Sequence, residues 1–202
     1  MSIGIKLTTG ALAFALASAA FAQAPAKPTR IRGEIVALSG DTLTVHRRSG
    51  DTVKVALKAD TPVTALKNIK LQDIKPGSFV GTAATTGVDG KLTATEVLVF
   101  PEAARGTGEG HYAWDLGSNS TMTNANVDQV VQGTSGRDLK LSYKGGSNAV
   151  TVPENVPVVT FAPATRDDLK SGKQVFVVAS PAGSDYAAQR IVVEKDGVKP
   201  PM

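Results

Sequence analysis

The residues whose types and spacing could do chemistry lie together at residues 105–116, in the stretch RGTGEGHYAWDL. If residues 109–116 run extended, alternate side chains point to opposite faces, which places Glu109, His111 and Asp115 on one face. An imidazole nitrogen and two carboxylates are suitable ligands for a divalent transition metal. The spacing matches no established metal motif and only one His takes part, so we treat a metal site as an alternative.

Three glycines alternate in the same stretch, at Gly106, Gly108 and Gly110. Their backbone N–H groups could bind an anion beside Arg105, although the lysine and hydroxyl of a P-loop are missing. A structural interpretation is stronger, because glycines supply turns with positive φ. Tyr112 and Trp114, on the opposite face from His111, then fill a groove between the two halves of the protein.

Other chemically suggestive residues have simpler explanations. His46 alternates with a valine and precedes two arginines, which is typical of a solvated strand face. Asp167 and Asp168 begin a short helical segment, where acidic residues favour the positive end of the helix dipole. No GxSxG, HExxH or GxxxxGK(S/T) pattern is present. We therefore expect a protein that is not an enzyme and needs no cofactor.

An internal repeat organises the elements that must position these residues. Four blocks of one half recur in the same order and at a nearly constant offset in the other: Leu43 matches Leu139, Pro62 matches Pro157, Gly77 matches Gly172, and Val97 matches Ile191. Such agreement indicates a tandem duplication.

Each copy alternates apolar and polar residues with a period of two, punctuated by glycine turns, which is typical of short strands. A polar segment ending at Gly77 or Gly172 can form at most a turn or two of helix. This order predicts an all-β fold of two tandem five-stranded OB-like barrels, each with a short helical segment between its third and fourth strands. We place the boundaries at 23–29 (linker), 30–100 (first barrel), 101–121 (glycine-rich connector), 122–196 (second barrel) and 197–202 (tail).

The first 22 residues are typical of a signal peptide. Lys6 precedes an uncharged run at residues 7–22, and Ala20, Phe21 and Ala22 fit a peptidase site, so the mature chain should begin at Gln23. An uncleaved N-terminal anchor is the alternative. We expect a periplasmic or secreted location. The absence of Cys excludes disulfides, thiolate chemistry and Cys-ligated zinc, and the formal net charge of +4 is spread along the chain.

The repeats and the segment that joins them resemble a known family. Two weakly similar strand repeats, each with a DIKPG or DLKSG step, are joined by FPEAARGTGEGHYAWDL and followed by STMTNANV. This pattern is similar, over most of the mature chain, to a family of exported bacterial proteins with a domain of unknown function. Some members are labelled metal ABC transporter permease, although a permease needs several membrane spans and the mature chain offers no such apolar run. The resemblance implies small OB-like barrels and an extracytoplasmic location.

Three classes of function remain open. We favour an exported non-enzymatic binding or structural module, whose partner is a small ligand or an envelope protein. A metal-associated extracytoplasmic protein is second. An OB-type nucleic-acid binder is third, since export removes that partner and stacking aromatics are few. The candidate ligand-binding residues are Arg105, Glu109, His111, Tyr112, Trp114 and Asp115.

Overall fold

The computed structural model describes residues 28–133 and 136–200, and confirms the prediction of an all-β fold. The expected signal peptide at residues 1–22 lies outside the described residues. None of the helices found in the described part of the chain has the length and apolar character of a membrane span. The strands are β1 (Thr29–Ser39), β2 (Thr42–Arg47), β3 (Thr52–Ala56), β4 (Val63–Asn68), β5 (Phe79–Thr86), β6 (Leu92–Val99), β7 (Gly110–Ala113), β8 (Ser120–Gly133), β9 (Gly136–Tyr143), β10 (Gly146–Pro153), β11 (Val158–Pro163), β12 (Gln174–Ala182) and β13 (Asp185–Val193).

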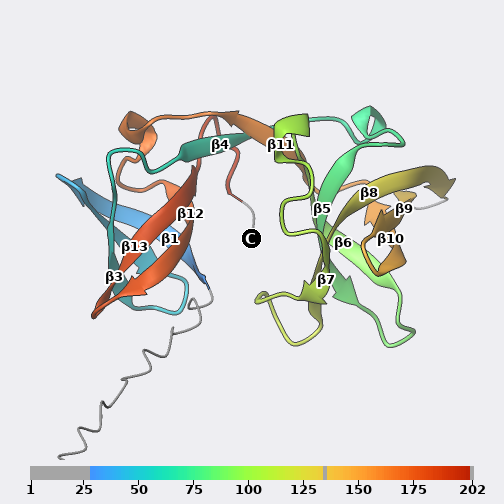
Figure 1. The fold of residues 1–202 in the computed structure, drawn as a ribbon, viewed down its shortest axis with the longest axis horizontal. Helices are drawn as coiled ribbons and strands as arrows, with labels where there is room; N and C mark the ends of the chain where they lie inside the picture. The colour runs from blue at the N-terminus through green and yellow to red at the C-terminus, as the bar shows by residue number, and fades with distance from the viewer. Residues whose placement is uncertain (1–27, 134–135, 201–202) are drawn as a thin grey trace, which may run out of the picture.

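Lobe 1 is a closed five-stranded barrel formed by β1, β2, β3, β13 and β12, seen on the left of Figure 1. The pairing of β3 with β13 is parallel, and the other pairings are antiparallel. Because side chains alternate along a strand, every second residue points inward. The barrel interior is therefore filled by Ile31, Ile35, Leu43, Val45, Val55, Val175, Val177, Ile191 and Val193.

Lobe 2, on the right of Figure 1, joins β8, β9, β10, β6 and β5 by the same succession of pairings. Here too the closing pair, β10 with β6, is parallel. The interior residues include Val80, Ala94, Val97, Ala125, Val127, Leu139, Leu141, Val150 and Val152. Each lobe thus has an apolar core of its own.

Neither lobe is built from one repeat, in contrast to the expected barrels at residues 30–100 and 122–196. The first three strands of one repeat close with the last two strands of the other, through the pairs β1–β12 and β5–β8. The last two strands in each half of the chain alternate in a similar way, so either pair could complete either three-stranded sheet. The sequence pattern of one half of the chain therefore cannot show whether its last two strands pair with its own first three strands or with those of the other half.

Strands β4 and β11 cross between the lobes as an antiparallel pair at the top of Figure 1. A third apolar cluster lies beneath them, formed by Leu66, Val159, Phe176 and Val192, with Leu98, Phe161, Val178 and Val198 packed against it. Val198 belongs to the segment expected to be a tail, and Pro200 beyond it is buried. The end of the described chain is therefore part of the contact between the lobes.

The short helical segments are single 3-10 turns, η1 (Leu71–Asp73) after β4 and η3 (Arg166–Asp168) after β11. In η3 the carboxylate of Asp168 accepts a hydrogen bond of 2.8 Å from the backbone N–H of Thr165, so this acidic residue caps the turn. Gly77 and Gly172 follow the two turns with φ of 85° and 83°. Because L side chains rarely adopt such angles, both turns favour glycine at this step.

Candidate functional site

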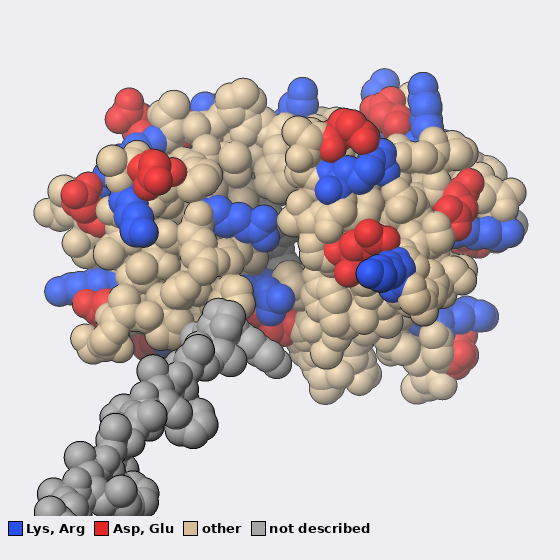
Figure 2. Space-filling model, in the orientation of Figure 1, with Lys and Arg blue, Asp and Glu red and all other residues tan. Residues whose placement is uncertain are grey.

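A cleft with a volume of about 260 Å³ lies between the two lobes. Strands β1, β12 and β13 form its lobe 1 wall, and β5, β6, β7 and β8 form its lobe 2 wall. The surface is hollowed at this position, with basic side chains along the lobe 1 side (Figure 2). Most of the lining is apolar or aromatic, including Leu98, Phe100, Met122, Phe161, Phe176 and Val192.

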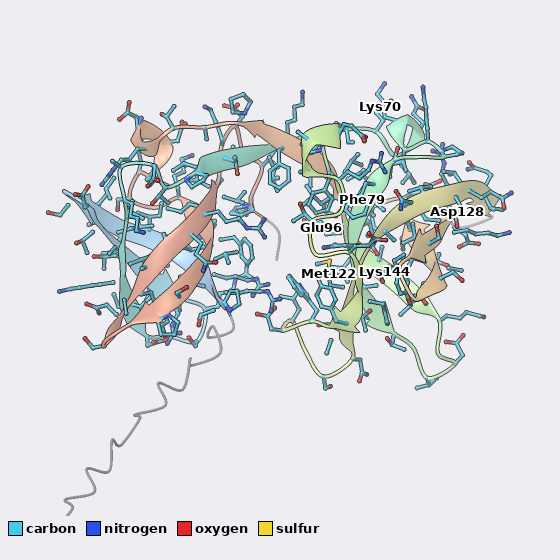
Figure 3. All side chains as sticks on the ribbon, viewed as in Figure 1. Lys70, Phe79, Glu96, Met122, Asp128 and Lys144 are labelled. Carbon is cyan, nitrogen blue, oxygen red and sulfur yellow. The ribbon has the colours of Figure 1, made fainter. Side chains whose placement is uncertain are left out.

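Residues 110–114 bring the stretch singled out in the sequence to this cleft. Strand β7 pairs with β8 in a register that sets Tyr112 opposite Met122, and beyond the strand the backbone N–H of Trp114 donates to the carbonyl of Ser120 at 2.8 Å. Alternation along this extended segment sends Tyr112 and Trp114 into the cleft. Figure 3 shows Met122 and Glu96 on the side of lobe 2 that faces lobe 1.

Trp114 and Asp115 reach across the cleft to strand β1 of lobe 1. The guanidinium carbon of Arg30 lies 4.0 Å from the centroid of the Trp114 ring, and that of Arg32 lies 5.4 Å from it. The two terminal nitrogens of Arg32 donate to the Asp115 carboxylate at 2.8 and 2.9 Å. We call these four residues the latch, because they connect the lobes on the side away from β4 and β11.

The charge state of the latch follows from its surroundings. Burial alone would raise the pKa of Asp115, but the hydrogen bonds and positive charge of Arg32 outweigh it, and the net pKa lies below its ordinary value. Burial raises the pKa of the Tyr112 phenol, partly offset by the charges of Arg30 and Arg190. At neutral pH the latch therefore holds an ionised carboxylate, and Tyr112 keeps its proton.

The structure does not bring Glu109, His111 and Asp115 together. Glu109 accepts a hydrogen bond of 2.9 Å from the backbone N–H of Lys144, and Nδ1 of His111 lies 2.8 Å from Oγ1 of Thr123. Asp115 lies in the turn after Trp114, where alternation no longer decides the direction of a side chain, and its carboxylate pairs with Arg32. Within residues 28–133 and 136–200, no group of three or more His, Cys, Asp or Glu residues is placed to hold a metal ion.

Arg105, the cation expected to bind an anion beside the glycines, is engaged elsewhere. The Arg105 guanidinium donates to the carboxylate of Glu102, to Oδ1 of Asn126 and to the carbonyl of Gly77 at the end of lobe 2. The three alternating glycines have φ of 82°, 59° and 138°, at Gly106, Gly108 and Gly110. These angles favour the structural interpretation, in which the glycines shape the path into β7.

Two buried polar atoms in the cleft wall have no hydrogen-bond partner among the described residues. Asn124 is 7% exposed. Its Nδ2 donates to the Thr107 carbonyl at 3.0 Å and to the Tyr112 hydroxyl at 3.2 Å, while its Oδ1 has no partner. The indole Nε1 of Trp114 is likewise unpartnered. Buried polar atoms are usually hydrogen-bonded, so an acceptor and a donor remain to be satisfied here.

Gly81 on β5 makes room for this arrangement. A Cβ atom at this position would stand 2.7 Å from Oδ1 of Asn124 and 3.1 Å from Cε2 of Phe100. Both distances are shorter than ordinary contacts, so a side chain at residue 81 would displace the Asn124 amide or the Phe100 ring. Glycine therefore sets the close packing of the lobe 2 wall.

Sequence reasoning identified Tyr112 and Trp114 but missed the lobe 1 wall, which comes from Arg30, Phe176 and Arg190. A signal for Phe176 is present, because residues 175–179 are apolar on both faces of their strand. Strands of that kind are covered on both sides. The arginines carry no such signal, since a basic residue on a strand is ordinarily solvated.

The fold and the cleft together define a class of protein, a two-lobed all-β protein with an apolar cleft between lobes that each combine strands from both halves of the chain. No protein family, curated protein or solved structure matches the chain.

Proposed function

We propose that this protein is an exported, non-enzymatic binding module whose small ligand lies in the inter-lobe cleft. The observation that carries this proposal is the combination of apolar walls with two unpartnered buried atoms, Oδ1 of Asn124 and Nε1 of Trp114. Ligand sites are typically concave and apolar, with a few polar groups that fix the orientation of the ligand.

The size of the cleft limits the ligand. Its volume of about 260 Å³ lies just below the range of about 300–1,000 Å³ typical of sites for drug-sized molecules. Binding rather than catalysis is supported by the kinds of side chain that line it, which are mainly aliphatic, aromatic, amide and guanidinium groups. Export is supported by the signal-peptide pattern at residues 1–22.

We also propose that the two lobes are OB-like barrels that arose by tandem duplication and exchanged their last two strands. The same succession of pairings in both lobes supports this origin. The similar φ values of Gly77 and Gly172 also support it.

A neutral fluorescent probe tests the cleft directly. N-phenyl-1-naphthylamine emits strongly only in apolar surroundings, and its emission is followed on adding the mature protein. Ala83 is buried on β5 and lines the cleft, so Ala83→Phe should fill the cleft and abolish the rise in emission. Ala113→Phe on β7 adds the same ring at an exposed position outside the cleft lining and should leave the rise unchanged.

Both variants are first shown to melt within a few degrees of the wild-type protein. An unchanged response in Ala83→Phe, or no response from the wild-type protein, would contradict the proposed function. Equal losses in both variants would also contradict it, because the probe would then bind outside the cleft.

A further inference from the structure

The charges in the inter-lobe cleft are unbalanced on the lobe 1 wall. Arg30 on β1 and Arg190 on β13 both line the cleft. Within the part of the chain that the structure describes, neither forms an ion pair with a carboxylate, whereas Arg47 pairs with Asp51 and Arg166 with Asp41. The cleft lining therefore carries two guanidinium groups on the lobe 1 wall against one carboxylate, that of Glu96, on the lobe 2 wall.

The two guanidinium groups are close enough to act on the same neighbours. The positive charges of both groups act to lower the pKa of the Tyr112 phenol, against the larger effect of burial. The charge of Arg30 also lowers the pKa of Arg190. Burial by neighbouring groups is the larger cause for Arg190, although its side chain as a whole is exposed. Partial burial and a neighbouring like charge both disfavour a cation, so a bound anion would relieve this cost.

The latch sets the position of Arg30 but leaves its charge uncompensated. Its guanidinium stacks on the Trp114 ring at 4.0 Å, while the Asp115 carboxylate is taken by Arg32. A guanidinium presents several N–H donors in a plane and binds carboxylate, sulfonate or phosphate oxygens in pairs. Arg30, which is held by the Trp114 ring, and Arg190, which lines the same cleft, thus offer two guanidinium groups to an anionic head.

We propose that the cleft takes a small amphipathic anion, with an aromatic or aliphatic body against Phe100, Phe161 and Phe176 and its anionic head beside Arg30 and Arg190. This inference rests on the proposed function and adds the chemical class of the ligand. The aromatic walls exclude a strongly hydrated ligand, and the two arginines disfavour a cationic one. The unpartnered Oδ1 of Asn124, on the opposite wall, accepts a hydrogen bond from a donor on the body of the ligand.

Compounds that share the naphthalene ring system test the class. Isothermal titration calorimetry of the mature protein at neutral pH compares naphthalene-1-carboxylate, naphthalene-1-methanol and naphthalene-1-methylammonium. We expect the carboxylate to bind at least about tenfold more tightly than the alcohol, equivalent to about 1.4 kcal/mol. The ammonium compound should bind most weakly. Naphthalene-1-sulfonate should behave as the carboxylate does, since the shared feature is the anionic head.

Substitution of Arg190 assigns the preference to the cleft. Arg190→Gln should remove most of the advantage of the carboxylate over the alcohol and leave the affinity for the alcohol within about twofold, and Arg190→Lys should restore part of it. Arg137→Gln is the matched control, because it removes one positive charge from lobe 2 outside this cleft. Melting temperatures establish that the variants are folded.

The outcomes separate this inference from the proposed function. Equal binding of carboxylate and alcohol would overturn the anionic class, while binding of the alcohol would still support an apolar cleft. A carboxylate preference that survives Arg190→Gln, or that Arg137→Gln also removes, would overturn the assignment to this pair of arginines. Failure of all the naphthalene compounds and of the neutral fluorescent probe to bind would overturn both.

Discussion

Substitution of Trp114 tests whether the latch contributes to the contact between the lobes. Trp114→Ala removes a half-buried indole that lies 4.0 Å from the Arg30 guanidinium and 6.2 Å from the Tyr112 ring. Truncation of a fully buried Trp costs about 3–5 kcal/mol, and partial exposure reduces this to about 2 kcal/mol here. The cation–π contact accounts for about 0.5–1 kcal/mol of that loss.

The free energy of unfolding is measured by urea denaturation followed by far-UV circular dichroism, because the variant lacks the only Trp of the chain. His111→Ala is the control, since His111 precedes Trp114 on the same extended segment but is exposed. We expect His111→Ala to change the unfolding free energy by less than about 0.5 kcal/mol. A smaller loss in Trp114→Ala than in His111→Ala would refute the role given to the latch.

Three further predictions concern the exchange, the ion pair and export. Protease cleavage engineered between Gly117 and Ser118 should yield fragments that elute together in size-exclusion chromatography, because each lobe takes strands from both; separate elution would contradict the exchange. The pKa of Asp115 lies below its ordinary value, so its pairing with Arg32 stabilises the fold above the unfolded-chain pKa of about 3.9, and that contribution is lost as pH falls through the folded-state pKa. Below about pH 5 the wild-type protein should therefore lose stability more steeply than Asp115→Asn, as measured by the two melting temperatures. The difference in unfolding free energy should be typical of a partly exposed pair, under about 1 kcal/mol. Parallel curves of melting temperature against pH would argue against this contribution. Intact mass should show a mature chain beginning at Gln23, and a full-length mass would count against signal cleavage.

Much of the local structure could be predicted from the sequence, because it depends on neighbouring residues. The period of two in residues 42–45 places Leu43 and Val45 inside lobe 1, as found. The turns at Gly77 and Gly172 follow from the conformational freedom of glycine. Exchange of strands could not be predicted, since the two repeats offer similar edges and only the course of β4 and β11 decides between them.

Only the lobe 2 wall of the cleft contains residues that the sequence predicted to lie at a site. Alternation placed Tyr112 and Trp114 on one face, because both lie on one extended segment. Asp115 could not be placed, because it lies in the turn that follows Trp114, where the extended alternation ends and the carboxylate pairs with Arg32. Arg190 comes from the far end of the chain, and only the exchange of strands brings it to this cleft.

A crystal structure of the mature protein with naphthalene-1-carboxylate tests the central claim, that the inter-lobe cleft is the ligand site, most directly. We expect density for the ring between the lobes, against Phe176 and Tyr112, with the carboxylate within hydrogen-bonding distance of Arg190. Density for the ring on the outer surface of either lobe, with the cleft unoccupied, would contradict it.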